Sequence, residues 1–374
     1  MSARRRFPIS LTMIVRDEAR VLARCLDSVT GLVDEIVIVD TGSVDDTVAI
    51  ATSYGAKVHH FDWVDDFAAA RNHALSHATH PWRLVLDADE WIVDREQASR
   101  VLADIGERKP AFVGSIDMFQ VGPDGSLDDS ALPQPLPRLL PPHVTFEGRV
   151  HEQPRPNIDT FLIGLLVGHD GYRDEAKARK EGRNADLLIA ALEEDPGNAY
   201  LWYQLAAEFF VRGMQSEALV YLTQAYNLLH PAEAGPDAPL QAPWWHRVSM
   251  RLILALIDQD RLEEAVQVGE LEASAWPESS DLFYVFGLAA RRLALSLRAS
   301  DPARAEDLAL AATGLWTRAA ELGDRQEFSG ALTARATVLA AQRLVEDYEM
   351  LGNTAEADRY RRLVAGEQIR KAGV

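Results

Sequence analysis

The stretch WRLVLDADEWI, from Trp82 to Ile92, decides how the first part of this 374-residue chain is interpreted. Its apolar run, residues 84–86, predicts a short buried strand. The carboxylates of Asp87, Asp89 and Glu90 follow that strand directly. Carboxylates held close together repel one another and are costly to desolvate, so something must compensate them. The sequence allows a bound metal ion, a basic neighbour or an exposed loop.

The surrounding sequence alternates short apolar runs with amphipathic helical patterns, which predicts βαβ units and a mainly parallel sheet. The expected strands are Ile9–Val15, Ile36–Val39, Lys57–Phe61 and Trp82–Leu86, and the expected helices are Glu18–Val29, Thr47–Tyr54 and Asp66–His77. Ligands of such sheets bind beyond the carboxyl ends of the strands. We therefore expect Arg16, Asp40 and Asp87 at one edge, although they are far apart in sequence.

A proline-rich segment interrupts the next strands. Ala111–Val121 and Phe161–Val167 are expected to be strands, whereas Gly122–Pro142 contains six prolines and is expected to be a loop. Residues 1–172 are therefore predicted to form one α/β domain.

The pattern becomes helical and alanine-rich over residues 173–374, which are predicted to form an all-α domain. DPGNAYLWYQLAAEF from Asp195 resembles WPESSDLFYVFGLAA from Trp276, with proline, leucine and tyrosine in matching places. A second element recurs as SEALVYLTQA, LEEAVQVGEL and TAEADRYRRL, from Ser216, Leu262 and Thr354. Such recurrence is typical of tetratricopeptide-like helical hairpins, and an ordinary helical bundle is the alternative. No clustered polar site is expected in this half.

The composition is that of a globular protein with an acidic surface. Hydrophobic residues make up 47% of the chain, and the formal net charge is -19. Such a surface repels phosphate backbones and anionic lipid, so neither nucleic acid nor a membrane surface is an expected partner. Cys25 is the single cysteine, which excludes an internal disulfide and a multi-cysteine metal site. Without a recognisable signal peptide or membrane-spanning run, a cytoplasmic location is expected.

The pair Asp87 and Asp89 predicts a divalent metal site. Residues two apart in an extended backbone point the same way, so both carboxylates can face one pocket. Carboxylate oxygens suit Mg²⁺ or Mn²⁺, and such an ion can bridge a diphosphate. The pattern alone is weak, because Asp258-Gln259-Asp260 repeats it at an expected hairpin turn, where we interpret it as solvated surface.

Two further residues are expected near that edge. Asp40 ends the second strand and could accept hydrogen bonds from a base or ribose, or could shape the following turn. Arg71, on the helix before the fourth strand, could pair with a phosphate, or with Asp87 or Asp89 when no metal is bound.

The order of motifs resembles a known family. ISLTMIVRDEARVLARCLDSV, DEIVIVDTGSVDDT, WVDDFAAARN and WRLVLDADEW look like the nucleotide-sugar-binding half of family 2 glycosyltransferases. FEGRVHEQP and VGHDGY resemble the later part of a bacterial subgroup with fused tetratricopeptide-like repeats, similar to enzymes that glycosylate peptides or surface glycans.

This resemblance implies a GT-A fold, a Rossmann-like α/β sheet that binds a nucleotide-sugar, usually UDP-linked, with a divalent metal (Mn²⁺ or Mg²⁺) and inversion at the sugar carbon. Asp87 would lie near the ribose and metal, and Asp89 would be the main metal ligand. The nucleotide pocket would be lined by Arg16, Asp40, Thr41 and Arg71. Thr41 stands where many relatives carry a second acidic residue, so base recognition can differ.

The acceptor side offers three candidate catalytic residues. Glu152 could accept the acceptor proton, with His151 orienting the acceptor or binding phosphate, unless Glu152 forms a structural ion pair with Arg149 or Arg155. Glu90 is the competing base, or a cap of the next helix. The resemblance also implies a late histidine or acidic residue in the metal site. His169 is the candidate here, with a structural role as the alternative, and imidazole suits Mn²⁺ better than Mg²⁺.

Glycosyl transfer is therefore the expected function, with the repeats binding a peptide or glycan acceptor or forming a homo-oligomer. A sugar-phosphate nucleotidyltransferase would need a Gly-rich phosphate loop after the first strand, where this chain has VRDEAR instead. The second alternative is a catalytically inactive scaffold whose repeats bind partners.

Overall fold

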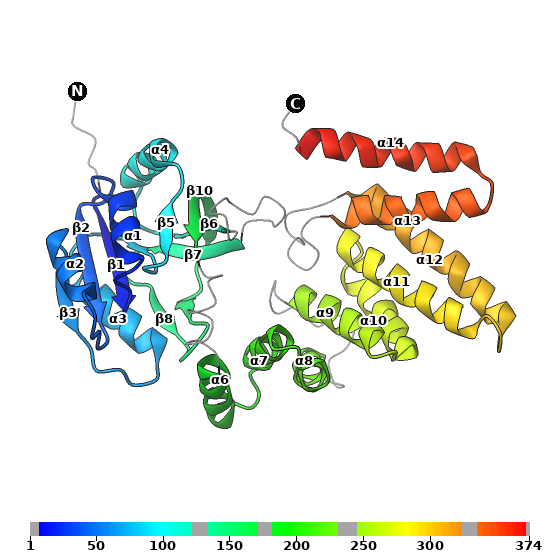
Figure 1. Cartoon of the computed structure of the whole chain (residues 1–374), viewed down its shortest axis with the longest axis horizontal. Helices are drawn as coiled ribbons and strands as arrows, with labels where there is room; N and C mark the ends of the chain where they lie inside the picture. Colours follow the sequence, from blue (N-terminus) through cyan, green and yellow to red (C-terminus); the bar gives the residue numbers. More distant parts are fainter. Residues whose placement is uncertain (1–6, 122–133, 171–181, 231–244, 324–334, 372–374) are drawn as a thin grey trace. The chain divides into compact units, whose positions relative to one another are not determined.

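The computed structural model describes residues 7–121, 134–170, 182–230, 245–323 and 335–371. The chain divides into two units, Met1–Ala191 and Leu192–Val374. Figure 1 shows a sheet with flanking helices in the first unit and helices alone in the described part of the second. The expected class, an α/β domain followed by an all-α repeat domain, is confirmed. The boundary expected at residues 172 and 173 lies outside the described residues.

An eight-stranded sheet forms the centre of the first unit, in the order β3-β2-β1-β4-β7-β6-β10-β5. Its strands are β1 (Ile9–Val15), β2 (Glu35–Asp40), β3 (Lys57–His60), β4 (Trp82–Val85), β5 (Glu90–Ile92), β6 (Val113–Gln120), β7 (Gln134–Leu140) and β10 (Thr160–His169). The pairs within β1 to β4 are parallel, as is the pair β6–β10, whereas β7 and β5 run antiparallel to their neighbours. A separate hairpin pairs β8 (Thr145–Glu147) with β9 (Gln153–Arg155).

Alternating side chains of the strands bury against both faces of this sheet. The helices of the first part are α1 (Leu22–Val29), α2 (Thr47–Ser53), α3 (Phe67–His77) and α4 (Arg95–Gly106), and α6 (Arg183–Glu194) follows the sheet. Leu84 and Leu86 join a core cluster with residues of α1 and α4. Val85, between them, packs with Ala68 and Leu75 of α3 in another cluster. Because successive side chains of β4 point to opposite faces of the sheet, α1 and α4 cover one face and α3 covers the other.

The predicted loop over Gly122–Pro142 is wrong in its second half, because β7 lies inside the sheet between β4 and β6. Pro135 and Pro137 pair with β6, whereas β4 pairs only with Leu139 and Leu140. Proline lacks the N–H that a central strand donates, and residues two apart point to the same side. Both prolines therefore occupy the part of β7 that has one paired neighbour, where the missing N–H costs least.

The described helices of the second unit pack as consecutive pairs. These pairs are α7 (Ala199–Val211) with α8 (Gln215–Leu229), α9 (Trp245–Asp258) with α10 (Leu262–Ala275), α11 (Ser280–Leu297) with α12 (Pro302–Leu322), and α13 (Ala336–Met350) with α14 (Thr354–Lys371). The two similar segments begin α7 and α11 in the same way. Asn198 Oδ1 accepts the N–H of Leu201 at 3.3 Å, and Ser279 Oγ accepts that of Leu282 at 3.0 Å. These hairpins confirm the tetratricopeptide-like expectation.

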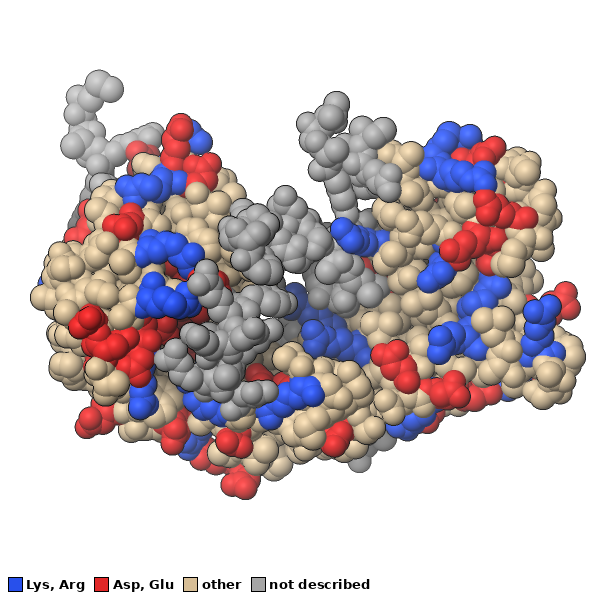
Figure 2. Space-filling model, in the orientation of Figure 1, with Lys and Arg blue, Asp and Glu red and all other residues tan. Residues whose placement is uncertain are grey.

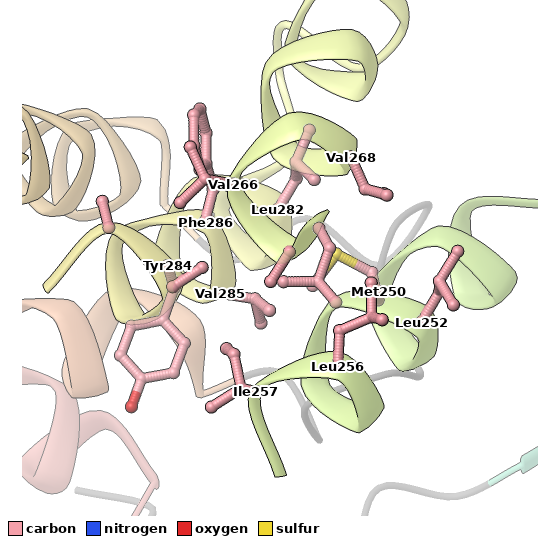
Figure 3. Packing of buried hydrophobic residues seen from close by; sticks show 14 of the residues in the cluster. Met250, Leu252, Leu256, Ile257, Val266, Val268, Leu282, Tyr284, Val285 and Phe286 are labelled. Atoms are coloured by element: carbon pink, nitrogen blue, oxygen red, sulfur yellow. The ribbon is translucent and has the colours of Figure 1, made fainter. Parts of the chain in front are cut away.

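Glycines allow two close approaches within this helical core. A Cβ atom on Gly269 of α10 would overlap the ring of Phe286, and one on Gly287 of α11 would overlap the ring of Trp316. Figure 3 shows Phe286 beside Val266 in this apolar packing. Small residues therefore let α10, α11 and α12 approach one another, as the repeat pattern predicts.

The surface carries charges of both signs. Figure 2 shows acidic and basic side chains interspersed over the visible face of each unit. Among the described residues, no helix combines the length and the apolar character needed to cross a membrane.

Candidate active site

The carboxylates that follow β4 are compensated by two arginines from elements that are distant in sequence. Arg71 of α3 places Nη2 2.9 Å from Asp87 Oδ1, and Arg138 of β7 places Nη2 2.9 Å from Asp87 Oδ2. The same Arg138 nitrogen lies 2.8 Å from Glu90 Oε1. Arg71 Nε also donates to Glu152 Oε1. A basic neighbour, one of the three explanations that the sequence allows, is therefore present at this point.

The two arginines affect Asp87 and Glu90 differently. Burial works against ionisation of Asp87, but the charges of Arg71 and Arg138 outweigh it and hold the pKa of Asp87 well below its usual value. Burial raises the pKa of Glu90, which is 2% exposed; Arg138 opposes this effect and the Asp87 charge adds to it. As the pH falls, Glu90 therefore takes up a proton before Asp87 does.

Glu90 supports the turn that carries Asp87. Its Oε2 accepts the backbone N–H of Asp87 at 2.9 Å, and its own strand, β5, pairs with β10. The alternative role of Glu90 as a helix cap is wrong, because Asp94 caps α4 by accepting the N–H of Gln97 at 2.9 Å. The sequence-predicted base Glu90 thus lies buried against Asp87 and Arg138.

Asp89 and His169 form a separate pair beside this network. His169 Nε2 lies 3.4 Å from Asp89 Oδ2, and both side chains are largely buried. His169 Nδ1 is 3.1 Å from Gln120 Oε1, an amide oxygen that can only accept. Nε2 is thus the ring nitrogen that faces Asp89, and a metal-binding histidine commonly uses its other ring nitrogen for a hydrogen bond of this kind. Asp87, the third predicted ligand, is instead directed to Arg71 and Arg138.

A carboxylate and an imidazole are a suitable donor pair for Mn²⁺ and a less suitable one for Mg²⁺. Within the described residues, no group of three acidic, histidine or cysteine side chains is arranged around a common metal position. Divalent ions at phosphate-transfer sites commonly take one or two protein ligands and complete their coordination with substrate phosphates and water. The pair Asp89 and His169 fits an ion held in that way.

The residues predicted for the nucleotide side lie at the ends of β1 and β2. Asp40 is buried, and its carboxylate accepts the N–H groups of Gly42 at 3.2 Å and Ser43 at 3.1 Å. Asp40 therefore shapes this turn, which is one of the two roles that the sequence allowed for it. Thr41 Oγ1 donates to the carbonyl of Val15 at 3.1 Å, which ties β2 to β1. Arg16, next along the chain, is exposed.

Glu152 belongs to the same network through Arg71. The structural ion pair that the sequence allowed as an alternative role for Glu152 is formed with Arg71 and not with the two arginines considered, Arg149 and Arg155. Asn72, the neighbour of Arg71, makes two hydrogen bonds of 2.8 Å to the backbone N–H and carbonyl of Phe146 in β8. Helix α3 therefore fixes both the hairpin that carries Glu152 and the arginine that contacts it. His151, beside Glu152, has a positive φ of 52°.

Sequence reasoning missed Arg138, because its segment was interpreted as a loop. The signal that could have revealed it is the apolar triplet around it, Leu136, Leu139 and Leu140, which is typical of a buried strand despite the prolines.

The expectation that the helical half lacks a polar cluster is wrong. Glu272 of α10 is fully buried and accepts hydrogen bonds from Tyr226 Oη at 3.0 Å, Ser249 Oγ at 2.7 Å and Trp276 Nε1 at 3.0 Å. His230 Nε2 lies 2.6 Å from the same carboxylate. These partners come from α8, α9 and the end of α10, so Glu272 joins successive hairpins. A single buried glutamate within a helical pattern carries no sequence signal for such a role.

Comparison with known proteins finds a family model that matches part of the first unit. Residues 10–152 match the family model described as "Glycosyl transferase family 2". The chain is 35% identical over 253 residues to a TPR repeat-containing protein of Synechococcus elongatus, covering 60% of this chain and 58% of that protein. It is 29% identical over 229 residues to the SPbeta prophage-derived glycosyltransferase SunS of Bacillus subtilis, covering 59% and 53%. The chain therefore spans little more than half the length of these relatives.

A solved structure of glucosyl-3-phosphoglycerate synthase from Mycobacterium tuberculosis, in complex with Mn²⁺, UDP and glucosyl-3-phosphoglycerate, is also similar in part. The identity is 20%, the match covers 31% of this chain and 45% of that chain, and the TM-score is 0.26.

Proposed function

We propose, from the match of residues 10–152 to glycosyltransferase family 2, that the protein transfers a sugar from a nucleotide-sugar, UDP-linked, to a peptide or glycan acceptor. We propose a divalent ion at the site and inversion at the sugar carbon, and the cytoplasm as the location. The observation that carries the proposal is one site in which Asp87, Glu90 and Glu152 share two arginines beside the pair Asp89 and His169.

Asp89 and His169 would hold the ion, Mn²⁺ by preference, with Asp87 beside it near the ribose. When bound, such an ion offsets the negative charge that develops on a departing diphosphate. Arg16, Asp40 and Thr41 would border the nucleotide, with Asp40 acting through the turn that it shapes.

Arg71 connects the donor side with the proposed base. Its Nη1 is buried and has no hydrogen-bond partner within the described part of the chain. A buried donor without a partner is costly, so an oxygen of the donor diphosphate would be stabilising there. A diphosphate that attracts Arg71 would also weaken its bond to Glu152. Glu152 could then accept the proton of the acceptor hydroxyl, with His151 orienting the acceptor.

The second unit is proposed to bind the acceptor or another copy of the chain. Paired helices of the repeat type present extended surfaces that suit peptides and other polymers. The described polar cluster around Glu272 is satisfied internally, which supports a structural role for it and leaves the chemistry to the first unit.

The test is a panel of sugar nucleotides offered to the full chain with Mn²⁺ or Mg²⁺, measured by nucleotide release and by thermal stabilisation. We expect one donor class to give both signals, and Asp89→Ala to lose the metal-dependent part of each while folding normally. Asp258→Ala, an exposed carboxylate at the end of α9, is the matched control and should behave as the parent. If no sugar nucleotide binds with either ion, the transferase proposal is wrong and the scaffold alternative takes its place.

A further inference from the structure

Three histidines of α3 and β3 form a cluster that takes no part in the candidate active site. His73 and His77 are one turn apart on α3, and His59 belongs to β3, the edge strand of the sheet. His73 Nε2 and His77 Nε2 are 3.3 Å apart, with their rings nearly perpendicular at 79°. The ring of His59 stacks on that of His77, with a centroid distance of 3.6 Å and an angle of 9°.

The distance between the two Nε2 atoms matches that of two ligands on one metal ion. Zinc–imidazole bonds of about 2.0–2.1 Å at a tetrahedral angle separate the two nitrogens by about 3.3–3.4 Å. Histidines at positions i and i+4 of a helix are a known arrangement for such binding, because both rings leave the same face.

We propose that His73 and His77 clamp a late first-row divalent ion, Zn²⁺ in particular, through their Nε2 atoms, at a site separate from Asp89 and His169. Within the described residues no third histidine, cysteine or carboxylate completes a three-ligand group, so water fills the remaining positions. His59 contributes its ring face, which holds the ring of His77 in place.

The chemistry of the two sites favours different ions. Two imidazoles suit Zn²⁺, Cu²⁺ or Ni²⁺, whereas a site with a carboxylate and phosphate oxygens suits Mn²⁺ or Mg²⁺. His73 and His77 are half-buried, so an ion can reach them from solvent.

An ion bound by His73 and His77 would stabilise α3, the helix that carries the active-site contacts. Arg71 and Asn72 directly precede His73 on α3, and they contact Asp87, Glu152 and the β8 hairpin. A link between two successive turns of α3 would stabilise the helix against fraying at its C-terminal half. The inference concerns binding and does not depend on the proposed transferase activity.

The experiment uses the tag-free full chain, stripped with chelator and titrated with Zn²⁺ and separately with Mn²⁺, with metal content and calorimetric affinity as readouts. All variants are made in an Asp89→Ala background, which removes the other proposed site. We expect Zn²⁺ affinity to fall roughly tenfold or more in His73→Gln and in His77→Gln, since loss of a ligand should cost at least as much as loss of an outer-shell partner.

Two variants serve as matched controls. His59→Phe keeps a stacked ring and should bind Zn²⁺ within about twofold of the Asp89→Ala parent, since its ring face and not its nitrogen faces His77. His143→Gln, at an exposed position, should also leave the affinity unchanged. Equal Zn²⁺ affinity in the parent, His73→Gln and His77→Gln overturns the proposal and leaves the cluster as an aromatic contact alone.

Discussion

Arg138 is the residue whose replacement tests the arrangement of charges most directly. Its guanidinium contacts both Asp87 and Glu90, and its side chain is 12% exposed. Arg138→Met keeps the length and much of the apolar stem of the side chain but removes the charge. Asp87 retains Arg71 as a partner, whereas Glu90 loses its ion-pair partner while remaining buried. The loss of folding stability should therefore arise mainly from Glu90, which keeps a buried charge without its ion-pair partner.

Removal of one partner from a buried ion pair typically costs about 3–5 kcal/mol. For a unit the size of the first one, each kcal/mol lowers the melting temperature by about 2–4 °C, so we expect a fall of about 6–20 °C in its transition. Glu90→Gln in the same chain removes the buried charge and should restore at least about 2 kcal/mol, a coupling that a double-mutant cycle measures. Arg108→Met breaks an exposed pair with Asp104 and should cost no more than about 0.5 kcal/mol.

The loss of folding stability caused by Arg138→Met should also depend on pH. Without Arg138 the pKa of Glu90 rises further above its usual value, so the folded state binds a proton that the unfolded state releases. Stability of this variant should therefore increase as the pH falls from about 7.5 to about 5, narrowing the gap to the parent. Denaturant unfolding at the two pH values measures this gap. If the variant unfolds within about 1 kcal/mol of the parent at both pH values, the buried charge of Glu90 does not depend on Arg138.

Two further predictions concern the base and the helical half. Glu152→Gln should lower kcat by about 10²–10⁴-fold while leaving donor affinity nearly unchanged; transfer at the parent rate, with loss in Glu90→Gln instead, would assign the base to Glu90. His246, which is buried, has its pKa lowered by burial to about 4 from its ordinary value of 6.5. The unfolded state therefore binds a proton at His246 more readily than the folded state does. The folding stability linked to this histidine is fully present above pH 6.5. It decreases by about 3 kcal/mol as the pH falls toward 4. Chemical unfolding of His246→Gln against the parent should show a shallower pH dependence, and equal slopes would contradict the assignment.

Features of this chain that depend on neighbours within a few residues were predictable from the sequence. The periods of two and 3.6 predicted the parallel strands and their helices, and the carboxylates after β4 marked the edge where the site lies. The recurring helical segments predicted the repeats, and in the structure the two similar segments begin with equivalent caps at Asn198 and Ser279. Each of these features is encoded locally, because strand alternation and helix capping involve contacts between residues close along the chain.

The groups that compensate the carboxylates could be found only in the folded chain. Arg138 and Glu152 lie 51 and 81 residues from their partners Asp87 and Arg71, and Arg138 reaches the site because β7 enters the sheet despite its prolines. The buried glutamate of the repeats, Glu272, finds its partners 23 and 46 residues away. Local patterns report whether a residue prefers a strand or a helix. An ion pair between distant segments depends instead on where the whole chain places two charges and on how completely water is excluded around them.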